Sequence, residues 1–365
     1  MQEPTPEYLP PLDPTPAQVI PQSFFIVTWT LIALNVLVYA AMCLKGISPI
    51  SPTSTDVLPW GADFGPLTLT GEWWRILTST FLHFGILHIG MNMYILYQVG
   101  PFTELLYGRT RFLILYLLAG LGGSIVSLAI HPLTTSAGAS GAIFGVYGAL
   151  LAFLVVQRGI IPAERSKSIA QSAGVFLLYN LFFGLSSKTT DLSAHGGGFV
   201  AGFLCGVFLA RPAVAGTRRL PVARTAMVAL AGLTIAVISL QALAKHDHFE
   251  GGLYREFMLS PHVPFGDKGT ILYSGSATKA EAQSLSQALA QIDDFKNSNI
   301  DLLLLKRNGH TDVFYMVNDK AASSADVAAA VGEATRHVAS SIGGLPITAH
   351  LVDEELQDRT SIPVE

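Results

Sequence analysis

Long apolar runs, separated by short polar segments, fill the first two thirds of this chain. Each run is long enough to cross about 30 Å of hydrocarbon as a helix. The second and sixth runs also carry polar residues, which are costly at membrane depth and tend to face a bundle interior or a site, so these two should score weakly on hydropathy. The pattern predicts seven transmembrane helices, at residues 24–42, 83–100, 111–130, 140–157, 168–185, 193–210 and 225–243.

At residue 270 the pattern changes to that of a small soluble α+β domain. Thr278 and Glu281 form a capping box that opens a helix, and Asn308-Gly309 is a strong signal for a hairpin turn. Around them the sequence predicts strands at 271–274, 300–306, 312–317 and 346–352, and a second helix at 324–340. The order β-α-β-β-α-β predicts a ferredoxin-like fold built from split βαβ units.

These patterns divide the chain into five segments. They are a polar, proline-rich N-terminal tail at 1–22, a membrane core at 23–211, a cytoplasmic loop with the seventh helix at 212–245, a linker at 246–269 and the soluble domain at 270–365. The tail has no lysine or arginine before the first apolar run, so we expect an extended tail and not a cleaved signal. In the linker, His246, Asp247 and His248 could hold a metal, but a solvated linker is the preferred interpretation.

Composition agrees with a membrane protein. Hydrophobic residues make up 50% of the 365 residues and charged residues 13%, below the roughly 25% of an ordinary soluble domain. A net charge of −4 provides no basic face, so nucleic acid is not an expected partner. Cys43 and Cys205 both lie inside apolar runs, which predicts neither a disulfide framework nor a thiolate metal site.

Basic residues gather in alternate loops. One set of loops contains Arg109, Arg111, Arg158, Arg165, Lys167, Arg211, Arg218, Arg219 and Arg224, whereas the other contains Lys45, Arg75 and Lys188. By the positive-inside rule the richer set is cytoplasmic. We therefore expect a multi-pass protein of the plasma (inner) membrane, with a cytoplasmic N-terminus and the soluble domain outside.

Candidate chemistry begins with Ser140, which opens the fourth run between Gly138 and Gly141. These glycines allow the backbone to turn sharply into a helix whose first N–H groups point at any developing negative charge. The serine can therefore act as a nucleophile. A serine that only caps the helix fits the same pattern.

His195 opens the sixth run, which starts from the same side of the membrane as the fourth. A neutral imidazole at that depth can accept the serine proton and pass it to a leaving amine. Packing alone explains the glycines of both runs, but it does not explain a serine and a histidine at their equivalent ends. Small residues recur at every fourth position, a pattern that lets transmembrane backbones touch, at Gly141, Gly145 and Ala149 and at Gly198, Gly202 and Gly206.

The second run contributes His83, His88 and Asn92, of which the last two share a helix face. Their side chains can donate hydrogen bonds to a tetrahedral oxyanion, or they can form polar contacts between helices. No His-Glu-x-x-His pattern occurs in the sequence, so a zinc site is not predicted.

Taken in order, these residues resemble the rhomboid family of intramembrane serine proteases across about residues 24–210. The motifs that carry the resemblance are Trp74-Arg75, His83, His88-x-x-x-Asn92, Glu104-x-x-x-Gly108, Gly138-x-Ser140-Gly141 and Ala194-His195-x-x-Gly198-x-x-x-Gly202. The resemblance implies an α-helical polytopic membrane protein with a rhomboid-like six-helix bundle, here followed by one extra transmembrane helix. It also implies hydrolysis of transmembrane substrates near the outer face, with no cofactor and no metal.

The resemblance further implies Ser140 as nucleophile, His195 as general base, and Asn92 and His88 as oxyanion donors together with the Ser140 N–H. Phe144 falls where some members have a tyrosine that stacks on the histidine, and a phenyl ring can stack as well. Supporting positions are Gly138, Gly141, His83, Phe144, Gly198 and Gly202.

Four further residues are expected to have no catalytic part. Glu104, Gly108 and Gly202 match packing or hydrogen-bonding positions of the family. Asp191 lies four residues before His195. Because the resemblance implies a dyad, we expect a solvated loop aspartate there and not a third catalytic residue.

Three classes of function compete at this point. The leading one is a serine endopeptidase that cleaves transmembrane or juxtamembrane segments of proteins in the lipid bilayer. A catalytically silent rhomboid-like scaffold that binds client helices would lack the serine or the histidine, and both are present. A seven-helix transporter or receptor would carry mid-membrane charges or broken helices, of which the runs contain little. The soluble domain would recruit substrate, bind a partner or stabilise the core.

Overall fold

The computed structural model describes residues 25–158, 161–186, 190–210, 222–246, 251–266, 269–293, 295, 300–354 and 356–365. The predicted tail at 1–22 lies outside these residues, as do Asp247 and His248 of the alternative metal group. Lys188, Arg211, Arg218 and Arg219, which entered the prediction of orientation, lie outside them too.

Seven helices of 17 residues or more occur among the described residues, and each coincides with one predicted run. They are α1 (Ile26–Leu44), α5 (Ile86–Tyr107), α6 (Arg109–Ile130), α7 (Ser140–Val156), α8 (Ala163–Ser186), α9 (Leu192–Leu209) and α10 (Val222–His246). The predicted boundaries lie within five residues of the observed ones, except that α5 continues to Tyr107, seven residues past its predicted end. Apolar length is therefore a reliable guide to these elements.

Hydropathy separates the seven helices into two groups. By length and composition, α1, α6, α9 and α10 are apolar enough to cross a membrane, and α7 is a shorter apolar helix. The polar residues of α5 lower its hydropathy, as predicted, and α8 contains Gln171 and Asn180. The predicted weakness of α9 is wrong, because glycine and alanine are nearly neutral and do not offset its Phe, Val and Leu residues.

The outward faces of the helices are apolar. In α10 only 6% of the apolar window is buried, and Leu230, Ile235 and Ile238 are exposed. On a helix of this length, such an apolar surface is typical of a membrane span. The chain is therefore a helical, multi-pass membrane protein.

The two small-residue stripes bring α7 and α9 into backbone contact. A Cβ atom added to Gly198 would lie 2.0 Å from the carbonyl oxygen of Gly141, and one added to Gly202 would lie 2.1 Å from that of Gly145. No side chain larger than hydrogen fits at that distance. The predicted close approach of the two helices is therefore present.

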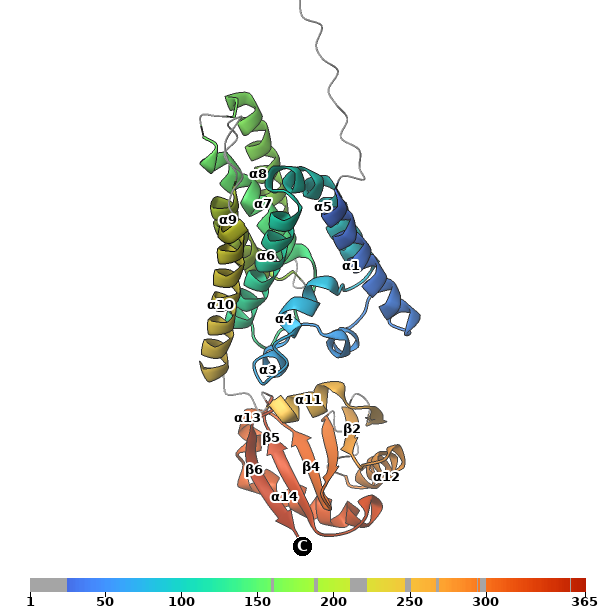
Figure 1. Ribbon diagram of the computed structural model, residues 1–365. Coiled ribbons are helices and arrows are strands. Elements are labelled where there is room, and N and C mark those ends of the chain that lie inside the picture. Colours follow the sequence, from blue (N-terminus) through green and yellow to red (C-terminus); the bar gives the residue numbers. More distant parts are fainter. Residues whose placement is uncertain are drawn as a thin grey trace, which may run out of the picture.

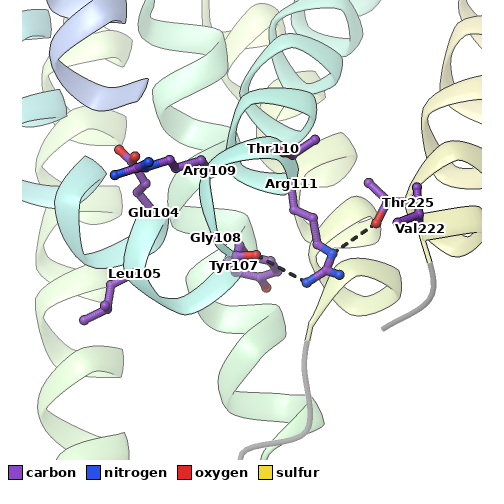
Figure 2. A pocket seen from close by; sticks show the side chains of 9 residues that line it. All are labelled: Glu104, Leu105, Tyr107, Gly108, Arg109, Thr110, Arg111, Val222 and Thr225. Carbon is purple, nitrogen blue, oxygen red and sulfur yellow. Dashed lines mark hydrogen bonds between the residues drawn. The ribbon is translucent and has the colours of Figure 1, made fainter. Parts of the chain in front are cut away.

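Polar contacts join the helices at the end of the bundle remote from the sheet domain. Glu104 on α5 accepts hydrogen bonds from the backbone N–H of Thr28 at 2.8 Å and from its hydroxyl at 2.7 Å, so it holds the start of α1. Arg111 on α6 donates through Nε to Thr225 Oγ1 on α10 at 3.0 Å (Figure 2). Both contacts are structural, as the sequence predicts for Glu104.

Residues 45–85 connect α1 to α5, and we call this segment the first loop. It contains the short helices α2 (Ser54–Val57), α3 (Gly65–Thr68) and α4 (Arg75–Thr78), with 3-10 turns at Leu58–Trp60 and Ser79–Phe81. The side chain of Arg75 is 2% exposed and donates to the carbonyl oxygens of Leu58 and Ala62 at 2.7 and 2.9 Å. The buried guanidinium therefore organises the loop from within.

The C-terminal part of the chain forms a six-stranded sheet in the order β1-β2-β3-β4-β5-β6. The strands are β1 (His262–Phe265), β2 (Gly269–Gly275), β3 (Leu302–Arg307), β4 (His310–Met316), β5 (Ile347–Val352) and β6 (Asp358–Val364). Pairs β2–β3 and β4–β5 are parallel, and the other three pairs are antiparallel. We call this part the sheet domain.

The predicted element order is present, with α12 (Lys279–Leu289) after β2 and α14 (Ala325–Val338), preceded by the single turn α13 (Asp319–Ala322), before β5. In a split βαβ unit another strand separates the two parallel strands. Here the two parallel strands are direct neighbours, since Ile271 pairs with Leu302 and Thr311 with Ile347. The predicted ferredoxin-like fold is therefore not confirmed. Strands β1 and β6 were not predicted.

Both faces of the sheet are covered. Leu302 and Leu304 join the apolar cluster beneath α12 and α14, whereas Leu303 and Leu305 join a second cluster that includes α11 (Gly251–Leu259). Figure 1 shows α11 between the sheet and the first loop. The predicted linker at 246–269 is therefore wrong over most of its length, because it contains both α11 and β1.

Candidate functional site

Ser140 and His195 meet at the starts of two neighbouring helices. Ser140 is the first residue of α7, and His195 lies in the first turn of α9. The distance between Ser140 Oγ and His195 Nε2 is 2.9 Å, which is a hydrogen bond. The depth match inferred from the order of the runs is therefore realised as direct contact.

The turn before Ser140 depends on Gly138. Its φ of +141° belongs to the region that favours glycine, and its N–H donates to the carbonyl oxygen of Ser79 at 2.9 Å. A Cβ atom at this position would lie 2.9 Å from Nε2 and Cε1 of His88. The glycine therefore permits both the backbone turn and the close position of the His88 ring.

The imidazole of His195 is held between helices. The ring of Phe144, one turn after Ser140, stacks on it with a centroid distance of 4.1 Å and an interplanar angle of 13°. Stacking by the phenyl ring, which the sequence allows, is thus present. His195 Nδ1 is buried and has no hydrogen-bond partner in the described part of the chain. With Ser140 donating to Nε2, the neutral ring carries its proton on Nδ1.

Two further residues predicted for the site, His88 and Asn92, lie on α5. The backbone N–H of Phe84 donates to His88 Nδ1 at 3.3 Å, so a neutral His88 carries its proton on Nε2, the atom next to Gly138. Asn92 lies one turn further along α5, and its buried amide nitrogen has no partner among the described residues. Both side chains therefore have donors that the fold itself does not use.

His83 stands behind His88. Its ring is fully buried and makes an edge contact with His88 at a centroid distance of 5.1 Å. Its own nitrogens have no hydrogen-bond partner among the described residues. The contact places His83 in a packing role toward His88.

Asp191 is not the solvated residue that the sequence predicts. It caps α9, and its carboxylate accepts hydrogen bonds from Ser127 Oγ at 2.5 Å, Ser136 Oγ at 2.7 Å, Ser193 Oγ at 2.6 Å and the Ala194 N–H at 2.9 Å. Burial raises its pKa, but these bonds outweigh burial and hold the pKa below its ordinary value. No hydrogen bond joins Asp191 to the imidazole of His195 among the described atoms.

A second carboxylate lies close by in the first loop. Asp63 is 1% exposed, accepts from Thr68 Oγ1 at 2.6 Å, and pairs its backbone with that of Ser136. Burial raises the pKa of Asp63, the Thr68 hydrogen bond lowers it and the nearby charge of Asp191 raises it again, so that the pKa is about 7. Neither Asp63 nor Ser136 belongs to a recognisable motif, so no signal in the sequence predicts their part in the site.

The remaining predicted residues lie away from the reacting pair or support it by packing. Gly141, Gly198 and Gly202 line the contact between α7 and α9. Trp74 lies under the guanidinium of Arg75 at 4.9 Å, in the first loop. Across the described residues no group of three His, Cys, Asp or Glu side chains is arranged to hold a metal ion.

Comparison with known proteins identifies the family to which this chain belongs. The family model of the Rhomboid domain matches residues 70–212. YdcA of Bacillus subtilis (strain 168), which is named as a rhomboid protein, is 34% identical to this chain over 140 residues. These residues make up 37% of this chain and 68% of YdcA. The chain belongs to the rhomboid family.

Two named rhomboid proteases extend the similarity. "Rhomboid protease GluP" of Bacillus subtilis (strain 168) is 40% identical over 186 residues, which are 51% of this chain but only 35% of GluP. "Rhomboid protease AarA" of Providencia stuartii is 29% identical over 203 residues, which are 49% of this chain and 71% of AarA. The family match at 70–212 covers most of the membrane core and does not include the sheet domain.

The close approach of α7 and α9 makes a prediction with a matched control. Gly198→Ala places a methyl group 2.0 Å from a carbonyl oxygen and forces the helices apart, whereas Gly196→Ala meets nothing within 4 Å. We expect Gly198→Ala to lower the free energy of unfolding by about 1–3 kcal/mol and to slow labelling of Ser140 by a fluorophosphonate probe. Gly196→Ala should leave both unchanged. Unfolding in mixed detergent micelles, followed by circular dichroism, measures the first effect, and equal behaviour of the two variants would contradict the packing argument.

Asp63 makes a prediction about pH. Its folded pKa of about 7 lies above the roughly 3.9 of an unfolded aspartate, so the folded state keeps a proton that the unfolded state releases. Its contribution to stability therefore decreases as pH rises from about 4 to about 7 and is constant above. Asp63→Asn keeps an acceptor for Thr68 but does not titrate. The stability of the variant relative to the unchanged protein should increase across that window, as measured by unfolding at several pH values; parallel pH profiles would show that Asp63 does not titrate there.

Proposed function

We propose that this protein is an intramembrane serine endopeptidase that cleaves transmembrane or juxtamembrane segments of membrane proteins. The observation that carries the proposal is the 2.9 Å contact between Ser140 Oγ and His195 Nε2 inside a bundle of apolar helices. Membership of the rhomboid family, whose named relatives include proteases, supports it. Because the chain spans only about a third of GluP, activity and substrates are inferred from the residues of this chain.

In the proposed reaction, Ser140 gives its proton to the neutral imidazole of His195 while Oγ attacks the carbonyl carbon of the scissile peptide. The carbonyl oxygen becomes an oxyanion in a tetrahedral intermediate. His195 then passes the proton to the amine that leaves, and an acyl enzyme remains on Ser140. Water attacks the acyl carbon, gives a proton to His195, and the proton returns to Ser140 as the acid leaves.

Donors for the oxyanion are supplied by the start of α7 and by α5. The N–H of Ser140 lies at a helix N-terminus, where the dipole favours negative charge. His88 and Asn92 add Nε2–H and amide donors that no other group in the described structure uses. A buried donor without a partner destabilises the resting protein, and its hydrogen bond forms only when the oxyanion is present. The bond therefore stabilises the transition state and not the resting state.

A dyad fits the environment of His195 better than a triad does. Asp191 is occupied by four other donors, and the ring is oriented by stacking on Phe144. The aspartate instead caps the helix that carries His195. Its charge stays close to the site without taking a proton.

Orientation and substrate follow from the same geometry. The positive-inside rule assigns the loops with the arginines to the cytoplasm, which places the N-terminal side of α1 there and the starts of α7 and α9 outside, on the side of the sheet domain. The site would then open near the outer face of the plasma (inner) membrane. A substrate helix must unwind before cleavage, because its peptide bonds are otherwise hydrogen-bonded and shielded.

Replacing either member of the pair tests the proposal directly. Ser140→Ala and His195→Ala should each reduce cleavage of a model transmembrane substrate in detergent or proteoliposomes to the detection limit, because one removes the nucleophile and the other its base. A fluorophosphonate probe should label the unchanged protein at Ser140 and fail to label Ser140→Ala. Helix content by circular dichroism serves as the control for folding. Full cleavage by either variant would eliminate the mechanism.

The oxyanion role of Asn92 makes a separate prediction. Asn92→Ala should lower kcat by about a hundred- to a thousandfold with little change in KM, because the lost hydrogen bond is strongest in the transition state. Met91→Ala, the neighbouring position on the exposed face of α5, is the control and should keep the activity of the unchanged protein. An equal loss in KM would instead assign Asn92 to substrate binding.

A further inference from the structure

One face of the sheet packs on α12 and α14, and the other face contacts the membrane core through α11. One apolar cluster of buried residues runs from the first loop through α11 to the sheet, and includes Phe64, Leu67, Tyr254, Phe257, Leu303 and Phe314. In Figure 1 the first loop, α11 and the sheet follow one another in that order. The sheet domain therefore shares a hydrophobic core with the first loop.

Specific contacts of α11 define the contact with the loop. The ring of Tyr254 meets that of Phe64 edge-on at a centroid distance of 5.9 Å, and both side chains are buried. Next to them, Arg255 forms an ion pair with Glu72. The other carboxylate oxygen of Glu72 accepts from Arg75 Nε at 2.9 Å and Nη2 at 2.7 Å. Glu72 thus joins α11 to the arginine that organises the first loop.

The opposite side of α11 is fixed to the sheet. Glu256 accepts hydrogen bonds from Ser274 on β2 and Arg307 on β3. Ser260 donates to the same carboxylate at 3.2 Å. Consecutive residues of α11 therefore hold the loop on one side and the strands on the other.

The first loop in turn holds the segment that leads into Ser140. The N–H of Asp63 donates to the carbonyl oxygen of Ser136 at 2.9 Å, and the N–H of Ser136 donates back at 2.8 Å. The N–H of Gly65 donates to the carbonyl oxygen of Pro132 at 2.8 Å. These backbone bonds attach the loop to the chain four residues before the nucleophile.

Ser136 also reaches the helix that carries the base. Its hydroxyl donates to Asp191, and the same carboxylate accepts from the N–H of Ala194, the residue before His195. Ser136 therefore bonds to the first loop, lies in the segment that leads into Ser140, and bonds to the residue that caps α9. The contacts of Asp63 therefore continue through Ser136 to the segments that carry both members of the reacting pair.

We propose that the sheet domain is a positioning element for the Ser140–His195 pair, acting through α11, the first loop and Ser136; the proposal rests on the proteolytic function proposed above. The docked domain keeps Phe64 and Asp63 in place, Asp63 keeps Ser136 in place, and Ser136 sets the start of α7 against the start of α9. The first loop has only single-turn helices of its own, so its shape depends on the surfaces that bury its apolar residues. The path ends on the reacting groups, which distinguishes positioning from recruitment of substrate.

Two variants of α11 test this role in the full-length protein in proteoliposomes. Tyr254→Ala removes the buried contact with Phe64, and Arg255→Glu places a like charge against Glu72 at a residue whose side chain is 58% exposed. We expect each to lower kcat for a model transmembrane substrate by about ten- to a hundredfold, since small misplacements of reacting groups have effects of that order. KM should change by less than about twofold. Arg255→Lys, which keeps the positive charge, should have the kcat of the unchanged protein.

Arg336→Glu on the exposed surface of α14 is the matched control and should match the unchanged protein in kcat and KM. Hydrogen exchange provides a readout that does not need cleavage. In both α11 variants the amides at 134–139 and 192–196 should exchange faster than in the Arg336→Glu control.

The outcomes separate the two proposals. A rise in KM with unchanged kcat, or unchanged exchange at 134–139, would overturn the positioning role and assign the domain to recruitment or to neither. If the unchanged protein neither cleaves the substrate nor reacts with a fluorophosphonate, the proteolytic function fails, whereas inert α11 variants of an active protein reject positioning alone.

Discussion

The backbones of α7 and α9 touch where Gly198 faces Gly141, and the geometry of the candidate site depends on that contact. In lipid no hydrophobic force draws helices together, so association depends on van der Waals packing between small residues and on polar contacts. Any side chain at Gly198 would push the helices apart, and the 2.9 Å distance between Ser140 and His195 would lengthen with them. Phe144, whose ring stacks on the imidazole, lies on the same helix as Ser140.

Polar groups within and around the bundle are mostly satisfied, as burial requires. Asp191 illustrates this, because four donors surround its carboxylate. Two of the exceptions belong to the candidate site, where the amide nitrogen of Asn92 and Nδ1 of His195 have no partner among the described residues; the others are at Asn35, Asp63, His83, Tyr116 and His350. Buried donors without partners are the atoms expected of a site that stabilises charge only transiently. The hydrogen bonds around Asp191 include Ser136, which connects the site to the first loop and, through that loop, to the sheet domain.

Local signals in the sequence were accurate where the structure they describe is local. The capping box of Thr278 and Glu281 forms, and Asn308-Gly309 makes the predicted turn with positive φ at both residues. α11 was missed because its apolar face has meaning only against the first loop and the sheet. For β3, the run of four leucines at 302–305 is a clear signal of a strand covered on both faces, and all four are buried in the structure. The strand order of the sheet could not be predicted, since helix-connected strands pair or separate according to long-range packing.

By itself the sequence determined the seven long helices, the serine and histidine at the starts of two of them, and the small residues that allow their approach. These properties depend on apolar length and on residues close together in the chain, so pattern alone specifies them. Only the tertiary structure decided that Asp191 caps α9 and does not act on His195, that Asp63 and Ser136 pair, and that the sheet domain docks through α11. Each of these depends on which distant groups bury one another, and burial is a property of the assembled fold and not of any segment within it.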